Sequence, residues 1–288
     1  MAVPIFTGSP SLRLSESASA RAGVRCGPMP RTLKPKPWAA HEIVEILDDF
    51  YGRAPHRPSG DPMAELVLTL LSQHTSDHNS GRAFHRLIER IPTWDGVLAA
   101  PTSEVEDAIR PGGLAPTKAP RIQALVAAVK AYTPTFDLGF LDTAPLEEAR
   151  AWLRALPGVG PKTAACVLLF ALGRPALPVD THVDRVSRRL GLVPPKMSVD
   201  NAHTHLEAMV PPEDVYAFHV DLIQHGRRTC HARAPLCEAC PLLARCPRVG
   251  LVPPAAAKAT KPAAKPTATK RATKAAAAAP SPRGRASG

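Results

Sequence analysis

The sequence predicts an all-α protein, and two observations carry that prediction. Between about residues 38 and 226, apolar residues recur at the three- and four-residue spacing of amphipathic helices, while the alternation typical of strands is nearly absent. Prolines, glycines and capping residues divide this stretch into short segments. No repeat of solenoid length is present. We therefore expect short helices packed around apolar cores.

The earliest strong helix signal is Asp61-Pro62, an N-cap followed by a first-turn proline. An apolar stretch follows directly, over 66–71. Further along, Ser103 and Glu106 stand three residues apart, which is a capping-box signature for a short helix. Pro120 lies near the predicted start of the next helix, where proline is tolerated. That helix carries an apolar stripe made of Ile122, Leu125, Val126 and Val129. Additional helices are predicted over 145–155, 162–172, 181–191, 199–209 and 213–225.

The positive charge is concentrated at the two ends of the chain. The 288 residues carry 36 Lys and Arg against 25 Asp and Glu, a net charge of +11. Residues 251–288 contribute +8 and residues 1–37 contribute +5, which leaves the region between them slightly acidic. Both ends lack the apolar residues needed for a core, so we expect disorder over 1–37 and 251–288. The C-terminal tail is either an electrostatic tether to DNA or a solubilising segment.

No apolar run reaches the ~20 residues that a membrane helix needs, so no membrane partner is expected. The Arg- and Ser-rich start is compatible with a disordered extension and also with an organellar transit segment. We expect a cytoplasmic, nucleoid-associated protein, and organellar targeting stays open as an alternative.

Four of the six cysteines fall within seventeen residues, as Cys230, Cys237, Cys240 and Cys246. Such clustering is unlike a secreted disulfide framework and indicates a metal site in a reducing compartment. Four thiolates suit an iron–sulfur cluster or a structural zinc. Zinc sites often pair two Cys-x2-Cys units, and this chain has only one. Cys166 lies apart from the group and is interpreted as a small core residue.

Residues 156–164 join two predicted helices through a glycine-containing turn, Leu-Pro-Gly-Val-Gly-Pro-Lys-Thr-Ala. Pro157 ends the first helix, and Gly158 and Gly160 permit a close approach to another surface or a positive φ. The unpaired amides that begin the second helix form an anion site suited to a DNA phosphate. The alternative is a tight helix–helix corner without ligand.

Lys162 begins that second helix, and Asp180 precedes the next one. Attack on a sugar C1′ needs a neutral amine, and burial together with a positive helix end disfavours the charged form of a lysine. An ionised carboxylate at a helix start can stabilise positive charge that develops on the sugar. The alternatives are an ordinary N-cap for Asp180 and a phosphate-binding lysine for Lys162.

These motifs, in this order, resemble the endonuclease III family of helix-hairpin-helix DNA glycosylases. The resemblance runs from about residue 62 to residue 247. It rests on the 156–164 hairpin, on the Pro-Val-Asp-Thr-His-Val-Asp-Arg-Val segment over 178–186, and on the Cys-x6-Cys-x2-Cys-x5-Cys spacing.

The resemblance implies that Lys162 is a Schiff-base nucleophile and Asp180 the catalytic carboxylate. It also implies that the four cysteines hold a structural 4Fe-4S cluster, with Arg233 in the Cys230–Cys237 loop touching DNA phosphates. Adenine-specific relatives lack the lysine, so its presence favours an enzyme that removes a base and then cleaves the strand.

The family fills the gap left by a flipped nucleotide with side chains from two loops. Gln73 and His74 resemble the first of these loops, and Leu114 resembles the second. Two departures are present: Gln73-His74-Thr75 replaces the Ala-Gln-Ala expected there, and Pro161 replaces an arginine before the lysine. Both departures leave the lesion preference open.

We therefore expect a six-helix barrel domain over 55–174, and an iron–sulfur domain made of 38–54 and 175–248. The predicted function is a monomeric, bifunctional DNA glycosylase and abasic-site lyase. Its partner is double-stranded DNA with damaged bases or abasic sites. Oxidised pyrimidines are the default substrate, with uracil or mismatched thymine as alternatives. The rival hypothesis is a non-catalytic DNA-binding module.

Overall fold

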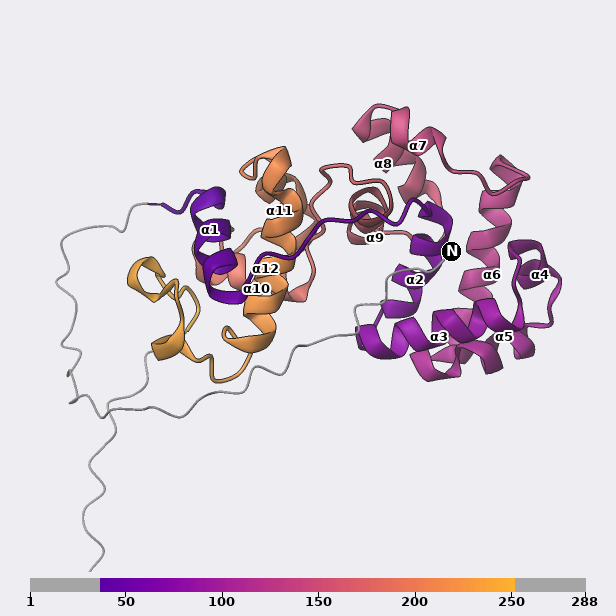
Figure 1. Cartoon of the computed structure of the whole chain (residues 1–288), viewed down its shortest axis with the longest axis horizontal. Helices are drawn as coiled ribbons and strands as arrows, with labels where there is room; N and C mark the ends of the chain where they lie inside the picture. Colours follow the sequence, from indigo (N-terminus) through magenta and orange to yellow (C-terminus); the bar gives the residue numbers. More distant parts are fainter. Residues whose placement is uncertain (1–36, 252–288) are drawn as a thin grey trace, which may run out of the picture. The chain divides into compact units, whose positions relative to one another are not determined.

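The computed structural model describes residues 37–251, and the helices within that range are labelled in Figure 1. No strand occurs in this part of the chain, so the all-α prediction is confirmed. None of its helices is long and apolar enough to cross a membrane. The predicted disordered ends lie outside the described residues, apart from Pro37 and Leu251. The helices are α1 Ala40–Tyr51, α2 Pro62–Ser72, α3 Asp77–Arg90, α4 Trp94–Ala99, α5 Thr102–Ile109, α6 Ala115–Tyr132, α7 Phe140–Thr143, α8 Leu146–Ala155, α9 Pro161–Cys166, α10 Thr181–Arg189, α11 Val199–Glu207 and α12 Val215–Arg228.

The starts of α2 and α5 test the helix caps that were predicted from the sequence. Asp61 caps α2 as predicted, and its Oδ1 accepts a hydrogen bond from the Ala64 amide at 2.9 Å. The capping box at Ser103 is wrong, because the N-cap of α5 is Pro101 and the helix begins at Thr102, two residues earlier than a Ser103 cap implies. The Pro101 carbonyl accepts hydrogen bonds from the amides of Glu104 (2.9 Å) and Val105 (3.3 Å), which starts the helix without a side-chain cap.

The predicted apolar stripe of α6 is buried along its whole length, which confirms it as the core-facing side of that helix. The helix is longer than predicted. It begins at Ala115, so Pro120 lies inside it rather than near its start. Leu114 is the N-cap residue, in a left-handed conformation.

The buried apolar residues form two clusters. The first runs from Met63 to Leu168 through α2–α9 and includes Ala176. The second combines α1 with α10–α12 and also takes in Leu169. Consecutive residues Leu168 and Leu169 therefore serve different clusters, within a π-helical turn over Val167–Ala171 that continues α9. The division into domains over 55–174 and over 38–54 plus 175–248 stays a prediction.

The second cluster depends on close packing of α10 and α1 against α12, helices that are distant in sequence (Figure 1). Gly226 of α12 faces α10. A Cβ there would lie 2.8 Å from His182 Nδ1 and 2.9 Å from Arg185 Nη2, a separation that real structures do not show. Any larger residue at this position would require His182 and Arg185 to shift. The helix that Asp180 caps, α10, is thus packed against α12, the helix that leads into the first clustered cysteine.

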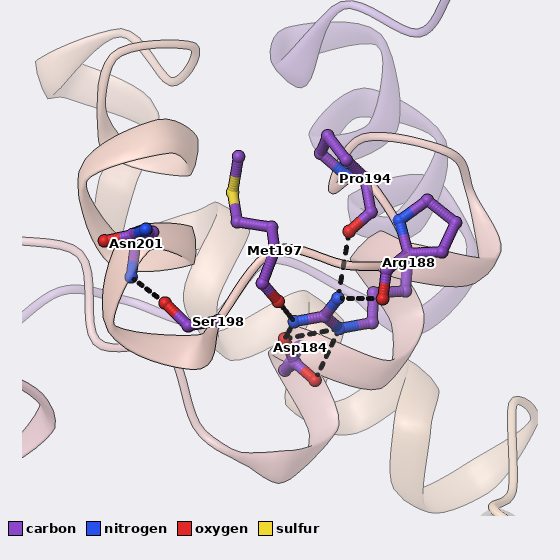
Figure 2. Close-up of polar contacts among 7 residues, drawn as sticks. Asp184, Arg188, Pro194, Met197, Ser198 and Asn201 are labelled. Carbon is purple, nitrogen blue, oxygen red and sulfur yellow. Dashed lines mark hydrogen bonds and ion pairs between the residues drawn. The ribbon is translucent and has the colours of Figure 1, made fainter.

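Arg188 fixes the turn between α10 and α11, as Figure 2 shows. Its Nε donates to both carboxylate oxygens of Asp184 at 2.9 Å. Its other nitrogens donate to the carbonyls of Pro194 (3.0 Å), Pro195 (3.1 Å) and Met197 (2.8 Å). The turn then enters α11 through Ser198, whose Oγ accepts a hydrogen bond from the Asn201 amide.

Candidate active site

The hairpin between α8 and α9 gives its two glycines different roles. Gly158 has φ +79°, and a Cβ there would lie 3.2 Å from Arg121 Nη2. Its left-handed backbone and this close neighbour both favour glycine. Gly160 is extended, with φ −95°, and a Cβ there would meet nothing within 4 Å. Internal packing therefore does not explain Gly160, and its missing side chain leaves the outer surface of the turn open.

Lys162 is the second residue of α9 and is half-buried, directly after Pro161 at the first helical position. Asp180 is the N-cap of α10. Its Oδ1 accepts hydrogen bonds from the amides of His182 and Val183, both at 2.8 Å. Because both capping bonds use Oδ1, they leave Oδ2 for other contacts. The N-cap interpretation and a catalytic role for Asp180 are thus compatible.

Two buried groups lie within the electrostatic range of both Lys162 and Asp180. Burial raises the pKa of the Cys166 thiol to about 12; Lys162 opposes this shift and Asp180 adds to it. Burial lowers the pKa of His219; Asp180 opposes that shift and Lys162 adds to it. The charges of Lys162 and Asp180, at the starts of α9 and α10, therefore act on the same two buried side chains.

Glu65 of α2 belongs to the same region, and sequence analysis missed it. Burial raises the pKa of its carboxyl to about 7, against the opposing effects of a hydrogen bond from Thr69 and of the Lys162 charge. The Thr69 Oγ1 donates to Glu65 Oε1 at 2.9 Å. A glutamate within the apolar stretch over 62–72 is the signal that could have drawn attention to it.

Three side chains hold the extended segment that leads into Asp180. Glu207 Oε2 accepts a hydrogen bond from the Leu177 amide at 2.9 Å. Buried His203 contacts the Leu177 carbonyl through Nδ1 at 3.2 Å, and buried His219 contacts the Pro178 carbonyl at 2.8 Å. These partners lie on α11 and α12, far along the chain. They fix the backbone from which Asp180 projects.

The two predicted wedge loops share an unusual backbone. His74, in the loop after α2, is exposed and has φ +57°. Leu114, before α6, is 56% exposed and has φ +52°. Non-glycine residues in this region are strained, and such strain gathers at functional sites. Gln73 is half-buried and extended.

Comparisons with known proteins identify the family. Residues 67–212 match the HhH-GPD superfamily of base excision DNA repair proteins. Endonuclease III of Bacillus subtilis is 37% identical over 209 residues, which cover 71% of this chain and 91% of that protein. The chain belongs to the HhH-GPD superfamily. Its resemblance to endonuclease III is thereby confirmed, and it is a DNA glycosylase of that kind.

Two further matches place the chain within the superfamily. A putative DNA glycosylase of Arabidopsis thaliana is 40% identical over 162 residues, and the matched region spans 55% of that longer protein. A solved structure of a trapped endonuclease III–DNA covalent intermediate is 35% identical, with a TM-score of 0.60, and the match covers 72% of this chain and 92% of that one. Solved endonuclease III structures of this kind contain DNA, which supports DNA as the partner of this HhH-GPD protein.

The four clustered cysteines of this HhH-GPD chain line one pocket at the end of α12. None forms a disulfide within the described range. Burial raises the pKa of the Cys240 thiol to about 11 and also raises that of Cys246. Burial disfavours the negatively charged thiolate form of a cysteine unless a nearby cation compensates for the lost solvation. Among residues 37–251, no group of three or more His, Cys, Asp or Glu residues has the arrangement of a metal-ion site.

A buried arginine organises the Cys230–Cys237 loop. Arg189 donates to the carbonyls of Cys230 (3.2 Å), His231 (2.7 Å) and Ala232 (3.0 Å), and its Nη1 lies 3.2 Å from the Cys230 sulfur. Arg233 is exposed near the tip of that loop. Sequence analysis missed Arg189, since nothing in a helical Arg-Arg pair shows which arginine points inward.

Proposed function

We propose that this glycosylase is bifunctional: it removes damaged pyrimidines and cleaves the resulting abasic site by β-elimination through Lys162. The observation that carries the proposal is the shared neighbourhood of Lys162 and Asp180 around Cys166 and His219. The covalent intermediate trapped with a related endonuclease III supports the same chemistry.

In the proposed reaction, the neutral Lys162 Nζ attacks C1′ of the flipped nucleotide while the bond between C1′ and the base breaks. The base leaves and takes up a proton. The sugar ring opens to an imine, loss of the C2′ proton expels the 3′ phosphate, and water then releases the lysine. Asp180 stabilises the positive charge on the sugar as the base departs.

We also propose that Cys230, Cys237, Cys240 and Cys246 bind a 4Fe-4S cluster. A compact set of four thiols in one pocket, in which burial raises the pKa values of Cys240 and Cys246, fits a cationic metal group. When bound, the cluster supplies structure to the loop. The purified protein is then expected to be yellow-brown, with about four iron atoms per chain. A colourless protein with one zinc would contradict this assignment.

The DNA surface is proposed to comprise the open turn at Gly158 and Gly160 and the exposed Arg233. The wedge is proposed to comprise Gln73, His74 and Leu114. Support comes from the empty space beside Gly160 and from the exposure of His74 and Leu114. The 158–160 turn directly precedes Lys162 in the chain, and His74 and Leu114 offer exposed side chains for contact with DNA.

Borohydride trapping on abasic duplex DNA tests the enzyme directly. The wild-type protein is expected to give a covalent adduct, and Lys162→Ala to give none. Lys196→Ala, at an exposed lysine, is the matched control and should trap normally. Tight DNA binding by the wild-type protein without any adduct would favour the rival, a non-catalytic DNA-binding module.

A panel of single-lesion duplexes tests the substrate class. We expect base removal from an oxidised pyrimidine such as thymine glycol. Faster removal of uracil or of mismatched thymine would replace this preference while leaving the lysine chemistry in place.

A further inference from the structure

Among the described residues, Lys118 has the largest of the fully buried side chains, and this side chain carries a charge. It lies in the first turns of α6 and is only 2% exposed. Its Nζ donates to the Leu71 carbonyl at 2.6 Å and to the Gly112 carbonyl at 2.8 Å. No carboxylate of the described residues forms an ion pair with it. Burying an unpaired ammonium is costly, so these two contacts must hold it firmly.

The two carbonyls belong to the roots of the two wedge loops. Leu71 is in the last turn of α2, two residues before Gln73 and three before His74. Gly112 ends the 3-10 turn Arg110–Gly112, two residues before Leu114. A positive charge at the carbonyl end of α2 is also favoured by the helix dipole. One ammonium thus joins two loops that lie about forty residues apart in sequence.

The loops need such a restraint. His74 and Leu114 both hold left-handed backbone conformations that are costly for non-glycine residues. Strained residues keep such conformations only where their surroundings determine them. Gly112 adds a steric restraint, because a Cβ there would lie 3.0 Å from the Ala83 Cβ.

We propose that Lys118 is a positioning residue that couples the two wedge loops, so that His74 and Leu114 enter the DNA as one rigid unit. The inference rests on the proposed wedge and extends it. Lys118 touches neither substrate nor the reacting atoms. Its contribution is to lower the cost of holding an extruded nucleotide, and it therefore depends on whether the lesion is paired.

The test compares Lys118→Met, which keeps the side-chain length and removes the donors, with wild type under single-turnover conditions. We expect base removal from thymine glycol opposite adenine to slow by about tenfold or more, because flipping a paired base is costly. With thymine glycol opposite an abasic analogue, the slowing should be less than about threefold. Lys130→Met is the matched control: this lysine is on the same helix, is exposed, and forms an ion pair with Asp95. It should match wild type on both duplexes.

A general loss of folding would slow both substrates equally, and that result would overturn the proposal. A second arm adds Lys118→Met to a His74→Ala, Leu114→Ala background. If Lys118 acts through the wedge, the added change should alter the paired-lesion rate by less than about twofold. A further drop of about tenfold would also overturn it.

If Lys118→Met does not fold, Lys118→Ala assayed with propylammonium replaces it. Restoration of the paired-lesion rate by the amine, and not by propanol, supports the proposal; no restoration by the amine overturns it. Absence of base removal by the wild-type enzyme on every duplex would instead refute the proposed function, so the two failures are distinguishable.

Discussion

The two apolar clusters of this glycosylase differ in what they bury. The first, in α2–α9, is almost entirely aliphatic, and the charged side chains that it shields from solvent within the described residues include Lys118 and Glu65. The second, around α12, encloses Arg189, Asp221 and the histidines 203, 219 and 225. A buried polar group must find a partner or shift its pKa. The second region therefore encloses the larger set of buried polar side chains.

The buried titratable groups of the second region change the stability of the protein with pH in opposite directions. Burial lowers the pKa of His203, His219 and His225. Their neutral forms contribute stability above the unfolded pKa near 6.5, and this stability is lost as the pH falls toward the folded pKa, about 4 for His225. Asp221 behaves in reverse, since burial raises its pKa to about 7. In the first region, burial raises the pKa of Glu65 to about 7 and lowers the pKa of Lys118.

The largest effect is expected from the paired arginines at the end of α10. Arg189→Met should destabilise the protein by about 4 kcal/mol and remove the iron of the proposed cluster, because several charged hydrogen bonds to the cysteine loop are lost. Arg188→Met is the control: it removes the contacts with Asp184 and with the 194–197 turn but none with the cysteine loop, so it should lower stability and keep the iron of the proposed cluster. Chemical denaturation and iron analysis measure both. Equal iron content in the two variants would contradict the role of Arg189.

In the first region, Leu125→Ala should cost about 3 kcal/mol of unfolding free energy, the usual effect of a cavity in an aliphatic core. The loss should be the same at pH 5 and pH 8, since no titrating group is involved. Urea denaturation at both pH values measures it. A loss that differed between them by more than about 1 kcal/mol would break the contrast between the regions.

In the second region, Asp221→Asn should give a pH-dependent gain. Both Asp221 carboxylate oxygens are buried without a hydrogen-bond partner among the described residues, and the nearby Asp48 raises the pKa further. The stability that the protonated form provides is full below pH 3.8 and is lost as the pH rises to about 7. The variant should therefore gain free energy of unfolding over wild type, and this gain should be about 2 kcal/mol larger at pH 8 than at pH 4.

Asp142→Asn, at an exposed aspartate, serves as the matched control and should show no such difference between the two pH values. Denaturation of the three proteins across this range supplies the comparison. A gain for Asp221→Asn that is equal at both pH values would point to packing rather than to ionisation.

The smallest changes in stability are expected from substitutions of the two hairpin glycines, Gly158 and Gly160, and the two changes should differ. Gly158→Ala should cost about 1 kcal/mol, because alanine resists a φ of +79°. Gly160→Ala should change stability by less than about 0.5 kcal/mol, since the space beside it is empty. If DNA covers that space, Gly160→Ala should nevertheless weaken DNA binding, as measured by fluorescence anisotropy. Unchanged binding would remove Gly160 from the proposed DNA surface.

Sequence analysis correctly predicted several features that depend only on neighbouring residues in the chain. The cap at Asp61, the buried stripe of α6 and the position of Asp180 at a helix start all depend on residues within one or two turns. The capping box at Ser103 failed on the same scale, because Pro101 takes the N-cap position two residues earlier and its carbonyl starts the helix.

The supporting residues of the site could not be found in this way. Lys118 meets a carbonyl 47 residues away, Arg189 bonds to a loop about 41 residues away, and His219 holds a carbonyl 41 residues away. Before the fold is known, each is an ordinary polar residue on a helix. Tertiary packing decides which side chains face the interior, as the close approach of α10 at Gly226 illustrates. Short sequence motifs do not reveal such packing.

The central claim is that the amine of Lys162 is the reacting group of this glycosylase. Reduction on abasic DNA followed by proteolysis and mass spectrometry locates the covalent bond most directly. The account predicts a sugar remnant on the peptide that contains Lys162, and on no other. A remnant on another lysine or on the terminal amine would contradict it.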